Sequence, residues 1–110
     1  MKLSIERSDD FNADFDKQYH WYLIEADAMV AERFLRAVAD TLPLLATQPE
    51  LGRLQKFRHP LLQNLRSFHV GRPFQNLLIF YKIEGNVLQA WRLMHGSRDL
   101  PRRLTEPSGS

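Results

Sequence analysis

The fold of this 110-residue chain is decided by residues 77–94, which read LLIFYKIEGNVLQAWRLM. Two segments rich in β-branched, aromatic and other apolar residues, 77–83 and 87–94, flank the short turn sequence 84–86 (Glu-Gly-Asn). This arrangement is typical of a β-hairpin. A further extended segment, residues 65–70, precedes it and is separated by Gly-Arg-Pro at 71–73. The C-terminal half is therefore expected to form three neighbouring strands.

The N-terminal half follows a different period. Residues 2–7 alternate apolar and polar side chains and predict a short strand, and residues 8–10 (Ser-Asp-Asp) predict the start of a helix. Apolar residues then recur every three or four positions, which predicts a first helix: Phe11, Phe15, Tyr19, Tyr22, Leu23 and Ala26. A second helix is expected from residue 27 or 28, with this apolar face: Val30, Phe34, Leu35, Val38, Leu42 and Leu45.

The predicted order of elements is β-α-α-β-β-β. This order favours the α+β class, with the helical hairpin packed on one face of a mostly antiparallel, four-stranded sheet. The other face and the rim of the sheet are then expected to carry Arg and His side chains. At this length we expect one domain, residues 1–104, followed by a loose tail at residues 105–110.

Several functional classes are excluded or disfavoured by composition. The chain has no cysteine, so disulfide and thiolate chemistry are excluded. Its four histidines are scattered without metal-ligand spacing, and it contains no nucleotide-binding glycine loop, so we expect no metal and no cofactor. The charged N-terminus does not resemble a signal peptide, and no apolar run is long enough to span a membrane. A cytoplasmic location is expected.

Charge is distributed unevenly along the chain. Residues 1–52 contain 5 basic and 10 acidic residues, whereas residues 53–103 contain 10 basic and 2 acidic residues. Eleven of the 15 basic residues are Arg, which suits bidentate contact with phosphate or carboxylate groups. An anionic partner, either nucleic acid or an acidic protein segment, is therefore expected. A basic sheet that only maintains solubility is the alternative.

The extended segments 65–72, 77–83 and 91–100, together with residues 48–53 (Gln-Pro-Glu-Leu-Gly-Arg), resemble the RelE/ParE superfamily of toxins from bacterial type II toxin-antitoxin systems. The resemblance extends from the first strand to about residue 104. It implies the same β-α-α-β-β-β fold and a cognate antitoxin partner in a heteromeric complex. It also implies a role in plasmid stabilisation.

Two activities occur in the superfamily, and the pattern is more similar to the ParE branch, whose members inhibit DNA gyrase by protein contact and not by enzymatic cleavage. The resemblance implies a target-binding surface of arginines at the C-terminal strands and beyond: Arg66, Arg72, Arg92, Arg98, Arg102 and Arg103. Trp91 alternates with Arg92, and we expect Trp91 to face the core. For Arg98 the alternative is a local ion pair with Asp99.

The second hypothesis is a RelE-like endoribonuclease that cuts mRNA on the ribosome. Arg98 matches an arginine of that branch, and His95 and His69 are the candidates for proton transfer. However, the position of that branch's sheet arginine corresponds to Leu78 here, and no tyrosine follows Tyr81. A third hypothesis is a non-toxic basic module that binds nucleic acid.

The antitoxin of this superfamily is a small, often acidic protein that folds as it wraps around the toxin. The resemblance implies that it lies along the helical hairpin and the sheet. The candidate contacts on the hairpin are Tyr19, Tyr22, Arg33 and Arg36.

Overall fold

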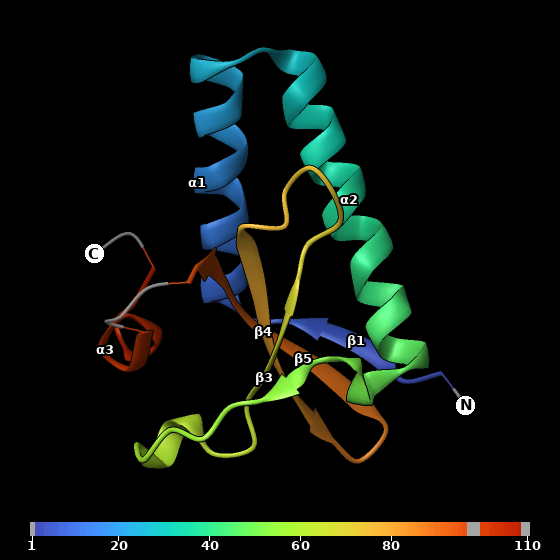
Figure 1. Cartoon of the computed structure of the whole chain (residues 1–110), viewed down its shortest axis with the longest axis vertical. Helices are drawn as coiled ribbons and strands as arrows, with labels where there is room; N and C mark the ends of the chain where they lie inside the picture. The colour runs from blue at the N-terminus through green and yellow to red at the C-terminus, as the bar shows by residue number, and fades with distance from the viewer. Residues whose placement is uncertain (1, 97–99, 109–110) are drawn as a thin grey trace.

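The computed structural model describes residues 2–96 and 100–108. Figure 1 shows a pair of long helices standing against one face of a twisted sheet, with a short helix near the C-terminus on the other side of the chain's C-terminal strand. The elements, in chain order, are β1 (Ser4–Arg7), α1 (Asp9–Glu25), α2 (Ala28–Thr47), the 3₁₀ turn η1 (Pro49–Leu51), β2 (Arg53–Leu54), the 3₁₀ turn η2 (Pro60–Leu62), β3 (Arg66–His69), β4 (Leu77–Glu84), β5 (Val87–His95) and α3 (Leu100–Thr105).

The sheet has five strands in the order β1-β5-β4-β3-β2. β1 runs parallel to β5, and the other neighbouring pairs are antiparallel. The predicted α+β fold with a mostly antiparallel sheet is confirmed, with one strand more than the four expected. The additional strand, β2, has only two residues at the sheet edge. Such a strand is too short to show an alternating pattern in the sequence.

Both long helices begin at a side chain that caps the backbone. The Phe11 N–H donates to Ser8 Oγ (2.9 Å), and the Val30 N–H donates to Asp27 Oδ1 (2.9 Å). Each side chain satisfies an N–H that has no partner within its helix. Ser8 Oγ also donates to the Trp91 carbonyl (2.7 Å), so the same residue fixes the start of α1 against β5.

The main core lies between the helical hairpin and the sheet. The helices contribute Phe11, Phe34 and Val38, and the sheet contributes alternate residues such as Ile79 and Tyr81, all of them buried. The rings of Tyr22 and Phe34 are 5.2 Å apart, and both contact Phe74 from the loop before β4. This packing places the aromatic stripe of α1 in the core, as its helical spacing predicts.

A second core covers the opposite face of the sheet. Phe80 and Met94 point away from the long helices and pack with Leu62 of η2, Leu65 and Leu104 of α3. The expectation that this face is left to Arg and His side chains is therefore wrong. Helix α3 was not predicted, because six residues at the end of the chain are too few to show a helical period.

None of the helices in the described part of the chain is long and apolar enough to cross a membrane.

Candidate functional site

Arg92 is the arginine whose position differs most from the prediction. Its side chain is only 5% exposed, and its Nε donates to Asp14 Oδ2 on α1 at 2.8 Å. Nη2 donates to Oδ1 of the same carboxylate at 3.1 Å, which makes the contact bidentate. The expectation that Arg92 belongs to an exposed target-binding surface is therefore wrong.

An irregularity in the sheet explains why Arg92 points inward. The register between β4 and β5 shifts at Phe80 and Tyr81, which pair with Arg92 and Ala90. Ala90 and Leu93 consequently both belong to the main core, although strict alternation would put them on opposite faces. A bulge of this kind redirects a side chain, and here it places Arg92, paired with Phe80, on the face of the second core, from which its guanidinium reaches Asp14 and the end of α3.

Trp91, the extra residue of the bulge, is only partly buried. It packs at the edge of the second core, with Lys82 Nζ 5.1 Å from the ring centroid. We expected Trp91 to be buried in the core and Arg92 to be exposed. In the structure, Arg92 is the more deeply buried of the two. Alternation alone could not identify the residue at which the pattern is broken.

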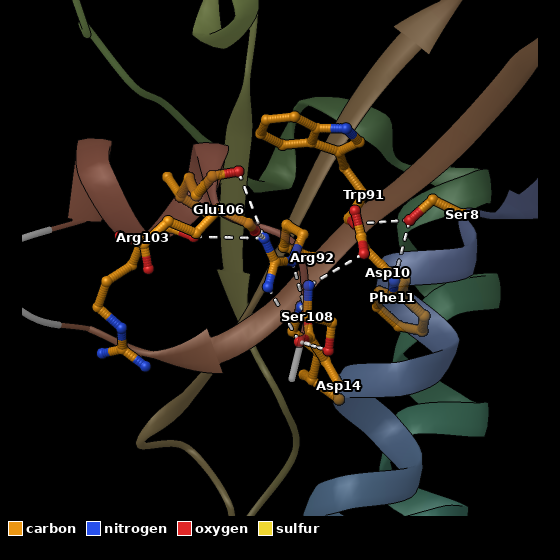
Figure 2. A network of polar contacts seen from close by, with 11 residues as sticks. Ser8, Asp10, Phe11, Asp14, Trp91, Arg92, Arg103, Glu106 and Ser108 are labelled. Carbon is orange, nitrogen blue, oxygen red and sulfur yellow. Dashed lines mark hydrogen bonds and ion pairs between the residues drawn. The ribbon is translucent and has the colours of Figure 1, made fainter. Parts of the chain in front are cut away.

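The Arg92 guanidinium also holds the C-terminal segment (Figure 2). Nη1 donates to the carbonyls of Arg103 (3.3 Å), Leu104 (3.4 Å) and Glu106, at the end of α3. A cation is favourable there because the last carbonyls of a helix lack intrahelical partners and carry partial negative charge. One buried side chain thus ties β5, α1 and α3 together.

Asp14 completes this network from the other side. Its carboxylate also accepts the Leu93 N–H (3.0 Å) and the Ser108 hydroxyl (2.7 Å), while the Ser108 N–H donates to Asp10 Oδ1 (3.1 Å). The part of the expected loose tail up to residue 108 is therefore bonded to the first turns of α1. Because its partners are about 95 residues away in sequence, local composition could not show this.

A cleft of about 200 Å³ opens beside the network, between α1, the end of β5 and the C-terminal segment. Its polar walls include Lys17 and His95, and Trp21 lies at its margin with an exposed fraction of 55%. Asp14 and Glu106 also line it, so the cleft has charges of both signs.

The two histidines considered for proton transfer are not brought together. His69 is opposite Leu78, which is opposite Met94 on β5. Strand alternation places His69 on the face opposite to Phe68, whereas His95 is on the same side as Leu93 and lines the cleft. His69 and His95 therefore lie on opposite faces of the sheet. Arg98, the third member of that hypothesis, lies outside the described residues.

The remaining arginines of the predicted target-binding surface are at separate places. Arg66 is partly buried and donates from Nη1 to the Gly52 carbonyl (2.8 Å). Arg72 is exposed in the loop between β3 and β4, which packs against α2. Arg102 and Arg103 are on α3, and Nη1 of Arg102 lies 3.8 Å from Oε1 of Glu106. No single face carries all of them.

Tyr81 explains the position of the turn that joins the helical hairpin to the sheet. Its buried hydroxyl accepts the Gly52 N–H (2.9 Å) and donates to the Pro49 carbonyl (2.7 Å). Burial raises the pKa of this phenol, while the bond from Gly52 and the nearby Arg66 charge oppose the shift. A Cβ at Gly52 would lie 2.2 Å from the Tyr81 hydroxyl oxygen, so glycine is required by close approach.

The residues proposed for antitoxin contact are all on the helical hairpin, in two different environments. Arg33 and Arg36 are exposed on the outer side of α2. Tyr19 is partly exposed and donates to Glu32 Oε1 (3.3 Å), and Tyr22 is packed against the main core, so burial raises its pKa.

The sequence reading missed an apolar group at the free end of the hairpin. Trp21, Ile24 and Met29 are 55%, 78% and 64% exposed. The signal in the sequence was that all three residues lie outside the regular apolar stripes of the helices. An apolar residue that is not on the buried face of a helix is exposed unless another element covers it. Exposed apolar side chains gathered in one place commonly mark an interaction surface.

Comparison with solved structures supports the same fold. The chain is similar to a structure described as the chromosomal ParDE toxin-antitoxin system from P. aeruginosa, with a TM-score of 0.70 and 16% identity over 87% of this chain and 98% of that one. It is also similar to the toxin-antitoxin complex RelBE2 from Mycobacterium tuberculosis, with a TM-score of 0.58 and 13% identity over 87% of this chain and 100% of that one. A conserved hypothetical protein, HP0894 from Helicobacter pylori, has a TM-score of 0.52 and 22% identity, covering 84% and 93% of the two chains.

No curated protein sequence is significantly similar to the chain. In contrast, a family model described as the ParE toxin of the type II toxin-antitoxin system parDE matches residues 5–100. The match includes both long helices and all five strands except the first residue of β1. The chain therefore belongs to the ParE toxin family of type II toxin-antitoxin systems.

Proposed function

We propose that this toxin inhibits DNA gyrase through protein contact, as its resemblance to the ParE branch implies, and that a cognate antitoxin neutralises it. The observation that carries the choice of binding over RNA cleavage is the separation of His69 and His95 on opposite faces of the sheet. General acid and base groups must reach the same reacting phosphate, so side chains on opposite faces do not cooperate. Leu78, between the two histidine-bearing strands, supplies no cation at the position where the ribonuclease branch has one.

The target contacts are proposed among the arginines that remain outside the core. Arg72 and Arg102 are exposed and Arg66 and Arg103 are partly exposed, while Arg98, the last candidate, lies outside the described residues. Arg92 no longer belongs to it as a contact residue, because its guanidinium is occupied by Asp14 and by the end of α3. Its role is to position α3, and with it Arg102 and Arg103, against β5.

The helical hairpin is proposed as the antitoxin surface. Its free end exposes Trp21, Ile24 and Met29, and α2 adds the exposed Arg33 and Arg36. Tyr19 and Tyr22 lie between these groups and the core. An apolar patch flanked by arginines suits an acidic, amphipathic segment that becomes ordered on binding, because burial of its apolar side chains offsets the entropy of ordering.

The purified chain should therefore inhibit supercoiling by gyrase and increase the amount of cleaved plasmid DNA. Addition of the antitoxin, expected from a neighbouring short gene, should restore supercoiling. In a parallel translation extract, mRNA should stay intact. Cuts in ribosome-bound mRNA, with gyrase unaffected, would identify the chain as an endoribonuclease and refute this proposal.

A matched pair of variants separates the two surfaces. We expect Arg72→Ala to weaken gyrase inhibition about 5- to 30-fold, as for an interface arginine worth about 1–2 kcal/mol, and to leave antitoxin binding unchanged. Arg33→Ala should do the opposite. If each variant affected both activities equally, the assignment of separate surfaces would be wrong.

A further inference from the structure

One segment of the chain combines positive charge with an absence of acidic residues. Residues 51–83 contain no Asp or Glu, so no carboxylate within this stretch balances its cations. The densest part is residues 53–59, which read RLQKFRH. This segment contains β2 and the loop that follows it, and β2 is the strand at one edge of the sheet.

The cations of this segment face solvent. Arg53, Lys56 and Arg58 are all exposed, and so is the neighbouring His59. Within the described part of the chain, Arg53, Lys56 and Arg58 form no ion pair, in contrast to the buried Arg92. His59 Nδ1 accepts the Leu61 N–H (3.1 Å), so in the neutral ring the proton is on Nε2, which can donate outward.

The neutral residues between these cations anchor the segment. The Gln55 N–H donates to the Leu65 carbonyl (2.8 Å), and Gln55 Nε2 donates to Ser67 Oγ (2.6 Å). Phe57 packs against the second core, and its carbonyl accepts a bond from Gln63 Nε2 (2.9 Å). The cations are therefore presented from a fixed backbone, which lowers the entropy lost when a ligand binds.

The segment is remote from the surface assigned to the antitoxin. In Figure 1 it is the green stretch at the end of the molecule opposite the turn between α1 and α2. The cations of residues 53–59 are exposed, no carboxylate in the same stretch balances them, and the backbone that carries them is anchored. We therefore propose that residues 53–59 form a binding surface for the phosphate backbone of nucleic acid. This inference goes beyond gyrase inhibition, because it assigns a second ligand to a different surface.

The arrangement favours phosphates over an acidic peptide. Three cations occur within residues 53–58, a span of at most about 18 Å, and a ligand whose charges recur along a strand can contact them in succession. Arg in particular forms bidentate contacts with phosphate oxygens.

The test measures binding of the full chain to a short fluorescein-labelled DNA duplex and to single-stranded RNA of equal length by fluorescence anisotropy. Each phosphate contact contributes about 0.9 to the slope of log affinity against log salt concentration for duplex DNA, and about 0.7 for a single strand. The variant Arg53→Gln/Lys56→Gln/Arg58→Gln should lose about 2.7 of the duplex slope. Between about 50 and 200 mM salt, affinity of the unchanged chain should then fall about 40-fold more than that of the variant.

The control variant Lys17→Gln/Arg33→Gln/Arg36→Gln removes the same charge from the two long helices and should retain the slope. The variant Arg53→Lys/Arg58→Lys keeps the charges and should also retain it, and circular dichroism verifies that every variant is folded. If both triple variants lost the same amount of this slope, the net charge of the chain and not this surface would explain the binding, and the proposal would be overturned. Competition by poly-glutamate as strong as that by DNA of equal charge would overturn it in favour of an acidic protein. The gyrase assay is independent of each of these results.

Discussion

Replacement of Asp14 by Asn tests whether the buried network stabilises the fold as its geometry indicates. The substitution preserves the shape of the side chain and removes its negative charge. It leaves the Arg92 guanidinium in a site where the side chain is 5% exposed and only backbone carbonyls and an amide remain as acceptors. Removal of one partner of a buried ion pair typically costs about 3–5 kcal/mol, because the other charge stays desolvated.

This loss is large for a chain of this size. A domain is usually stable by about 5–15 kcal/mol, and an unfolding entropy of about 2.1 cal/mol/K per residue converts the expected loss into a fall in Tm of about 13–22 °C. Chemical and thermal unfolding followed by circular dichroism measure both quantities. Within the network, Asp14→Asn also weakens the acceptor for Ser108, so the C-terminal residues should exchange their amide hydrogens faster.

The exposed pair between Arg102 and Glu106, 3.8 Å apart, provides the matched control. Glu106→Gln retains the backbone carbonyl that Arg92 uses and should cost only about 0–1 kcal/mol, as surface ion pairs do. The double variant Asp14→Asn/Arg92→Met should be more stable than the sum of its single variants predicts, since no unpaired charge remains. A loss below about 1 kcal/mol for Asp14→Asn, or additivity in the double variant, would refute the reasoning.

Three further outcomes follow from other contacts. Gly52→Ala should destabilise the fold by about 1–3 kcal/mol in denaturant unfolding, since its Cβ would lie 2.2 Å from the Tyr81 hydroxyl oxygen and force the turn to move; unchanged stability would contradict the close approach. Because burial raises the pKa of Tyr81, its contribution to stability is fully present below about pH 10, the pKa of an unfolded tyrosine, and is lost as pH rises through the folded value. The loss of unfolding free energy above about pH 10 should accordingly be smaller in Tyr81→Phe than in the unchanged chain, and identical pH profiles would count against it. Leu104→Ala should cost about 2–5 kcal/mol, because Leu104 is 1% exposed in the second core, whereas the exposed Leu61→Ala should change stability by less than about 0.5 kcal/mol; similar values for the two would argue against the packing of α3.

Local sequence patterns predicted the elements that have enough residues to show a period. Most of the apolar positions predicted for α1 and α2, the cap at Ser8 and the turn around Gly85 correspond to observed structure. Leu23, Ala26 and Leu35 are the exceptions, because all three are exposed although their spacing placed them on the apolar faces of the helices. Gly85 has a φ of 57°, the left-handed conformation that the hairpin turn requires. The two-residue β2 and the six-residue α3 were missed because a period cannot be recognised over so few positions.

The candidate site was predicted less well than the fold. Arg and His residues were placed on surfaces from their chemistry alone, and this reasoning was wrong for Arg92. A buried arginine looks the same in sequence as an exposed one until its partner is known, and Asp14 is 78 residues away. The separation of His69 from His95 depended likewise on strand pairing and on the bulge that precedes the end of β5.

The sequence by itself determined the class of fold, the order of the long elements, the family to which the chain is similar and the concentration of positive charge after residue 52. These properties depend on local periodicity, turn chemistry and composition, each of which is complete within a short stretch of chain. Only the tertiary structure decided which cations are available to a partner. Burial and pairing are set by residues far apart in sequence, so Arg92 became an internal tie while Arg53, Lys56 and Arg58 stayed exposed and anchored.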